Sequence, residues 1–243
     1  MAAFITRDVT IDSYTVVETV AGVPEGYNIG DLLNMPYMVD SWPKCHRAIK
    51  TMNNVGAIMP CSIVGKYCSQ RAPADDVPDA SLLRGIVVAL SETLLSKEIR
   101  DLVSSPSTLV VHMRAGDLWQ YVSRDDFINS ICAKGVEFEN VLLCTGVHAD
   151  AQHRPVDDSR RETLRLVKTV LDRLPNALAF CGSADDTLAL ASCASNILVH
   201  RGGFSCLMSL VSSSASNVLY TKSFVSPQKE HWRCRMVATY TAI

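Results

Sequence analysis

The sequence predicts an α/β protein whose carboxyl-terminal part is a doubly wound, mostly parallel β-sheet. Short β-rich runs alternate with helical patterns from residue 108 to residue 221, and such alternation is typical of parallel strands joined by crossover helices. These runs are almost continuously apolar, as expected for strands that helices cover on both faces. Since ligands of such sheets bind beyond the carboxyl ends of the strands, we expect the functional residues there.

Local patterns justify each element of this sheet. Apolar, β-rich runs predict five strands at residues 108–113, 141–144, 177–181, 196–200 and 217–221. Between them, apolar side chains recur every three or four residues, which predicts helices at residues 159–174, 185–193 and 204–213.

The first 105 residues are expected to form a smaller α/β lobe, with residues 106–243 as the carboxyl-terminal Rossmann-like lobe. The run 14–20 suggests a strand, and residues 71–79, with two prolines and three aspartates, indicate a loop. After this loop Asp79 and Ser81 offer N-caps to one amphipathic helix over residues 82–103.

Composition excludes several classes of protein. Apolar residues make up 48% and charged residues 20% of 243 residues, and the net charge is −2. This balance is that of a globular protein without the basic footprint of a nucleic-acid binder. The first eight residues lack the pattern of a signal peptide, and no apolar run is long enough to span a membrane.

The cysteines also bear on the compartment. The nine cysteines form no CxxC pair, and four of them, Cys144, Cys181, Cys193 and Cys206, lie in apolar runs. Reduced, buried thiols are the ordinary state of such residues inside the cell, so we expect a cytoplasmic protein.

Motifs for P-loop nucleotide hydrolases, simple dinucleotide oxidoreductases, α/β-hydrolases and zinc proteases are absent from the sequence. Two strand ends carry polar and glycine residues instead. The segment 112–117 reads His-Met-Arg-Ala-Gly-Asp, and the segment 200–205 reads His-Arg-Gly-Gly-Phe-Ser. Both fall at the edge of the sheet where a ligand is expected.

The second segment is suited to binding an anion. Gly202 and Gly203 permit a close approach of the backbone, and Ser205 opens a helix whose free N–H groups and dipole favour a phosphate. The alternative is a tight strand-to-helix turn that needs glycine for its shape alone.

The first segment supplies a fixed positive charge. Arg114 can hold a diphosphate with two parallel hydrogen bonds, and Asp117 can orient its guanidinium. The alternative is a surface ion pair that contributes little.

The segment 112–117 resembles the H-x-R-x-G-D motif of the fucosyltransferase-like superfamily, which has a GT-B fold of two Rossmann-like lobes. The stretch from Ser183 to Ala191, followed by a strand and Gly-Gly-Phe-Ser, is similar to a later segment of that superfamily, so the resemblance covers roughly residues 82–222. It implies that Arg114 binds the β-phosphate of the donor and that Gly116 and Asp117 shape its turn.

The resemblance assigns further roles. Asp185 or Asp186 would lie near the base or ribose, and Gly203, Phe204 and Ser205 would meet the diphosphate. His112 would contact nucleotide or acceptor, unless it is a histidine that faces the core. His200 and Gly202 belong to the same ligand-binding edge.

The function implied is a metal-independent, inverting glycosyltransferase, with residues 1–105 as the lobe on the acceptor side and residues 106–243 as the nucleotide-sugar-binding lobe. It would move a 6-deoxyhexose from a nucleotide-diphosphate sugar to a glycan or protein hydroxyl, with GDP-L-fucose as first donor and an L-rhamnose donor as second. Arg114 and Asp117 would be its catalytic residues, and no metal or other cofactor is expected, because no D-x-D motif stands between the strands. The general base is left open among Asp117, Asp31, Asp40 and Glu25.

Two other functions compete with this one. A non-catalytic nucleotide-sugar-binding protein is supported by Ala115, where many members of the superfamily carry a second arginine, and by residues 28–34, which match the superfamily's G-x-G-N turn poorly. A phosphate-handling hydrolase would use His112 or His200, but neither lies in a known nucleophile pattern.

Overall fold

The computed structural model describes the part of the chain that forms one β-sheet and its covering helices. The described residues are 3–10, 16–20, 23–24, 81–115, 124–150, 156–182, 184–200, 205, 208–209, 211–213, 216–220 and 240–242. The central strands are β4 (Thr108–Ala115), β5 (Asn140–Asp150), β6 (Ala177–Cys181), β7 (Asn196–Val199), β8 (Asn217–Tyr220) and β9 (Tyr240–Ala242). They are mutually parallel and lie in the order β6-β5-β4-β7-β8-β9.

This strand order is that of a doubly wound sheet. Counted from β4, the six parallel strands stand in the spatial order 3-2-1-4-5-6, which is the order of Rossmann-like sheets. The chain builds the sheet outward from β4 through β5 and β6, then returns to the other side of β4 to add β7 and β8. The predicted α/β class and mostly parallel sheet are therefore confirmed.

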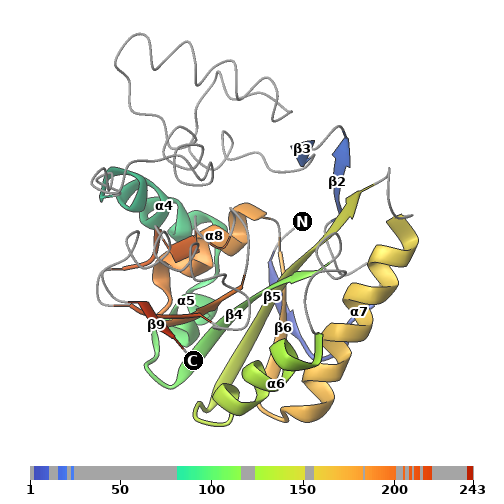
Figure 1. The fold of residues 1–243 in the computed structure, drawn as a ribbon. Helices are drawn as coiled ribbons and strands as arrows, with labels where there is room; N and C mark the ends of the chain where they lie inside the picture. Colours follow the sequence, from blue (N-terminus) through green and yellow to red (C-terminus); the bar gives the residue numbers. More distant parts are fainter. Residues whose placement is uncertain are drawn as a thin grey trace.

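Helices cover both faces of the sheet (Figure 1). One face, called here the α8 face, is packed by α4 (Ser81–Leu94), α5 (Lys97–Ser104) and α8 (Ala184–Cys193). The other, the α7 face, is packed by α6 (Arg124–Gly135) and α7 (Val156–Arg173). Ser205, Met208, Ser209 and Val211 are also helical, and Met208 and Val211 pack on the α8 face.

Strand residues alternate between these two faces, because successive side chains of a β-strand point in opposite directions. In β4, Val110 joins the core of the α8 face, whereas Val111 joins that of the α7 face. In β5, Leu142 and Leu143 divide in the same way. Both sets are fully buried, which explains why the strands are apolar without alternation.

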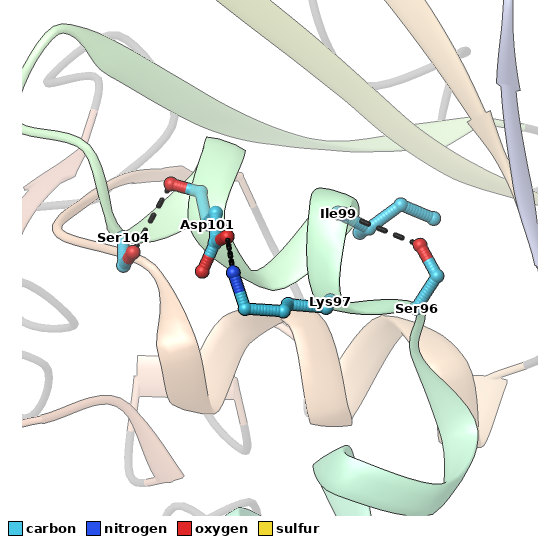
Figure 2. Close-up of polar contacts among 5 residues, drawn as sticks. All are labelled: Ser96, Lys97, Ile99, Asp101 and Ser104. Carbon is cyan, nitrogen blue, oxygen red and sulfur yellow. Dashed lines mark hydrogen bonds and ion pairs between the residues drawn. The ribbon is translucent and has the colours of Figure 1, made fainter.

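The predicted single helix over residues 82–103 is wrong, because the chain forms two helices. The break falls at Leu95 and Ser96, and Ser96 caps α5 by accepting a hydrogen bond from the backbone N–H of Ile99 at 3.4 Å (Figure 2). A serine offers a backbone N–H an acceptor outside the helix and so favours a helix start. Because apolar residues recur at helical spacing on both sides of Ser96, the sequence pattern did not reveal the break.

The sequence analysis predicted fewer strands than the structure contains. The five predicted ones are present, but β9 adds a sixth parallel strand. The predicted strand 141–144 continues to Asp150, because residues 145–147 pair with β4 and residues 147–150 pair with β2 (Val16–Val20), Val16 opposite Val147. β3 (Val23–Pro24) pairs with β2, and Figure 1 shows both at the far end of β5. α6 was not predicted from the sequence.

The described strands of residues 1–105 belong to this same sheet, and the helices of this region pack on it. β1 (Phe4–Thr6) lies antiparallel to β6 at its edge, and α4 and α5 pack on the α8 face. Residues 25–80 lie outside the described residues, so a separate lobe ending at residue 105 stays a prediction. Of the helices in the described ranges, none combines the length and apolarity required to cross a bilayer.

Arg7, just beyond β1, ties the amino terminus to the end of α7. Its guanidinium donates to the backbone carbonyls of Leu171 at 2.6 Å, Pro175 at 2.5 Å and Ala177 at 2.7 Å. The last carbonyls of a helix lack partners within it and attract positive charge. Arg7 therefore serves as a cap for α7.

Side chains also close the amino edge of the sheet. Asn176 donates to the carbonyls of Gly135 and Phe138, and Asn196 donates to those of Pro106 and Thr108. These hydrogen bonds fasten the connections that lead into the strands. The carboxyl edge, where the strands lead out, is the edge at which a ligand is expected.

Candidate functional site

The candidate site lies where β4 and β7 part at the carboxyl edge. Pairing between these strands runs from Leu109 opposite Asn196 to Val111 opposite Leu198, whereas β4 stays paired with β5 as far as Ala115 opposite Val147. The connections from the two strands lead to opposite faces of the sheet: α6 follows β4 on the α7 face, and helical residues follow β7 on the α8 face. This switch point is the ligand-binding position of doubly wound sheets.

A buried hydrogen bond spans the switch point. His112 is the first residue of β4 beyond the last pair with β7, and its Nδ1 lies 2.7 Å from Oγ of Ser205. The side chains are 3% and 2% exposed. Ser205 is helical and stands just after the Gly-Gly-Phe segment. The hydrogen bond therefore joins the end of β4 to the segment that follows β7.

The surroundings of His112 exclude water and charge on the β5 side. Its partner in register is Cys144 of β5, which is fully buried in the core of the α8 face. Burial raises the pKa of the Cys144 thiol well above its ordinary value, because a thiolate loses its hydration there. Cys144 is thus a neutral neighbour of His112 and not a counter-ion.

His200, by contrast, packs on the opposite face. Its ring stacks on that of Phe127 of α6, with centroids 3.8 Å apart and planes 12° apart. Both rings are buried, and Phe127 belongs to the core of the α7 face. The sheet therefore separates His200 from the pair formed by His112 and Ser205.

The start of α8 also lies at the carboxyl edge of the sheet, on the α8 face. Asp186 lies in its first turn and is 6% exposed. Gly182, which joins β6 to α8, packs so closely that an added Cβ would lie 2.9 Å from Cβ of Asp186 and 2.9 Å from the ring of Phe180. Glycine at this position lets α8 begin directly against the sheet.

The structure brings together two of the predicted site residues, His112 and Ser205, and it places Asp186 in the first turn of α8. Arg114 is the last but one residue of β4, in register with Gly146 of β5, and Asp185 is the second residue of α8. Five predicted site residues lie outside the described residues: Gly116, Asp117, Gly202, Gly203 and Phe204. Their roles, like those of Arg114 and Asp185, stay predictions.

Comparisons of the chain with models of known protein families, with curated proteins and with solved structures find no match. The resemblance to fucosyltransferase-like enzymes consequently rests on the motifs of the chain itself, and the chemistry of the site has to be argued from its residues.

Sequence reasoning did not identify Gly182 or Thr145 as residues that shape the site. Thr145 of β5 donates from Oγ1 to the carbonyl of Met113 at 2.7 Å and so fastens the outgoing end of β4. The signal for Gly182 was in the sequence, because a glycine stands between an apolar strand and the acidic start of a helix. Thr145 gave no such signal, since its strand was expected to end at Cys144.

Proposed function

We propose that the protein is a metal-independent, inverting glycosyltransferase that moves a 6-deoxyhexose from a nucleotide-diphosphate sugar to a hydroxyl of a glycan or protein. GDP-L-fucose is the first candidate donor and an L-rhamnose donor the second. The pairing of β4 with β7 carries the proposal. It makes neighbours of the two strands that lead into the H-x-R-x-G-D and Gly-Gly-Phe-Ser segments, although some 90 residues separate these segments in the sequence.

The chemistry required at this edge is stabilisation of a leaving group. The acceptor oxygen attacks the anomeric carbon, the bond from that carbon to the diphosphate oxygen breaks, and the acceptor proton passes to a base or to water. Negative charge then builds on the departing diphosphate. Arg114 and the backbone N–H groups of residues 203–205 are the donors proposed to meet this charge, and preorganised donors of this kind are a major source of catalysis.

A ligand screen followed by a transfer assay tests the proposal. The melting temperature is measured with GDP, UDP, dTDP and their sugars, and the stabilising donor is then incubated with a panel of glycan and peptide acceptors in EDTA. We expect stabilisation by a nucleotide diphosphate and transfer that survives the chelator. Loss of transfer in EDTA with recovery in manganese contradicts the metal-independent mechanism, and binding without transfer favours the non-catalytic alternative.

A further inference from the structure

We infer that His112 is a positioning residue that holds Ser205, and with it the Gly-Gly-Phe-Ser segment, in place for the diphosphate, without itself contacting the ligand. The inference rests on the proposed function, since it assigns His112 a part in the same site. It differs from the direct contact with nucleotide or acceptor that the resemblance implies.

The position of the hydrogen bond is the first argument. Backbone pairing between β4 and β7 extends as far as Val111 and Leu198, and the hydrogen bond from His112 to Ser205 begins one residue later. It therefore connects the two sides of the switch point just where the sheet opens. The residues it joins are 93 positions apart in the sequence, so it fixes two segments that the chain does not hold together locally.

Burial is the second argument. With His112 3% and Ser205 2% exposed, the two side chains interact where water competes little, and a hydrogen bond there is stronger than at a surface. Removal of one partner leaves the other buried with a lost hydrogen bond, which costs more than the bond contributed. The 2.7 Å separation is at the short end for such a contact. The Nδ1 atom of the ring is consequently engaged by Ser205 in a buried place.

The composition of the segment is the third argument. Gly202 and Gly203 precede Ser205 by three and two positions, and glycine restricts the backbone less than any other residue type does. Donors stabilise a developing charge well only if they are fixed before the reaction. The hydrogen bond from the imidazole of His112 provides such a fixed point at Ser205, the last residue of this segment.

A double-mutant cycle on the full chain tests this assignment. The variants are His112→Leu, Ser205→Ala and their combination, and the measurements are the dissociation constant of whichever of GDP, UDP or dTDP stabilises the wild-type protein, and the melting temperature. We expect each single change to weaken nucleotide binding about tenfold, which corresponds to about 1.4 kcal/mol. The double variant should be no weaker than the weaker single variant, because both changes break the same bond.

His112→Asn provides the conservative rescue. Its amide can present either a donor or an acceptor near the place of Nδ1, so we expect binding within about threefold of wild type. Phe127→Leu is the matched control, because it changes a buried ring on the opposite face. It should lower the melting temperature and leave the dissociation constant unchanged.

Hydrogen exchange supplies a readout without ligand. In His112→Leu and Ser205→Ala the backbone amides of residues 202–209 should exchange about tenfold faster than in wild type, and those of α6 should not change. If the losses of nucleotide affinity in the two single variants add in the double variant, the inference is overturned in favour of direct contact. The same holds if His112→Asn does not restore binding. If nucleotide affinity is unchanged in all variants, the hydrogen bond serves the fold alone and the inference is wrong. If the wild-type chain binds none of the three nucleotides, the proposed function fails and this inference fails with it.

Discussion

The two faces of the sheet differ in the polar groups that they bury. On the α8 face the described residues include a set of buried polar side chains: Ser91, His112, Asp186, Thr187, Ser192, Ser205, Ser209 and Ser212. On the α7 face, the corresponding residues among those described are Thr163 and His200. Ser91, Ser192 and Ser212 each donate to the backbone carbonyl three residues earlier, whereas the hydrogen bond between His112 and Ser205 joins two distant segments.

The two histidines show how the fold makes this distinction. Each follows an apolar strand and precedes an arginine within two residues, so their sequence contexts are almost alike. Val111, however, is opposite Leu198, so the same register sets His112 beside Val199 and not beside His200. A one-residue offset sends the side chains to opposite faces. One histidine reaches Ser205 and the other reaches Phe127.

The largest effect on stability is expected on the α7 face. Phe127→Ala removes a fully buried ring that stacks on His200, and such a change costs about 3–5 kcal/mol of unfolding free energy. Chemical denaturation measures the loss. Binding of nucleotide diphosphate to the folded fraction should stay at the wild-type level, and weaker binding there would show that the α7 face takes part in the site.

Arg114 tests the functional side of the comparison. Arg114→Lys keeps the charge but loses the paired geometry of the guanidinium. We expect it and Arg114→Ala to lower kcat about 100-fold or more, the effect of losing one preorganised donor. Steady-state kinetics beside a melting curve separates this from misfolding. Near wild-type turnover in Arg114→Lys, or unfolding of both variants, contradicts the assigned role.

Gly182→Ala is expected to change both stability and nucleotide binding, because it alters the packing of the α8 face. The new methyl group would lie 2.9 Å from Cβ of Asp186 and from the ring of Phe180, so α8 has to shift. Overpacking of this kind costs about 1–3 kcal/mol. We expect a lower melting temperature and weaker nucleotide binding together. A control at the other end of α8 is Ser195→Ala, which changes a side chain at the amino edge that donates to the carbonyl of Ser104 and should leave binding unchanged.

The smallest effect concerns thiol chemistry, which should be suppressed on both faces. Burial raises the pKa of Cys181 to about 11 and that of Cys144 further. Both thiols therefore stay protonated at pH 8, and the thiolate is the reactive form. Iodoacetamide should modify Cys193, which is partly exposed, before either of them. Mass spectrometry of the native protein after a timed reaction gives the order.

Raising the pH sharpens this last test. Since a raised pKa favours the protonated form in the folded state, the contribution of Cys181 to stability is complete below pH 9 and declines as the pH approaches 11. Labelling of Cys181 should increase across that range while Cys144 remains unmodified. Labelling of Cys144 at pH 8 in the folded protein would show that the α8 face opens to solvent.

The sequence was sufficient for the parts of the fold that depend on local patterns. The strand 177–181 was predicted with its observed ends, because an apolar run there is bounded by a proline–asparagine turn and a glycine. Contacts between distant segments could not be predicted. The extension of β5 to Asp150 depends on pairing with β2, more than 120 residues earlier in the chain. No property of residues 145–150 alone indicates that partner.

The candidate site divides in the same way. The two strand ends were located from sequence because helices and strands alternate regularly, and the pairing of β4 with β7 makes them neighbours. The difference between His112 and His200 required the strand register, which a single sequence does not reveal. The sequence shows a glycine at position 182, but its close packing against Asp186 depends on the path of α8.

The hydrogen bonds of Arg7 have a consequence for the order in which the chain folds. They join residues that are 164 to 170 positions apart, and closing a loop of that length costs about 4–5 kcal/mol of chain entropy. β1 can therefore dock only after β5, α7 and β6 have assembled. Until then the outer edge of β6 carries unpaired backbone groups that a second chain could pair with. β1 thus joins after β6, and its three residues then protect the outer edge of β6 from edge-to-edge aggregation.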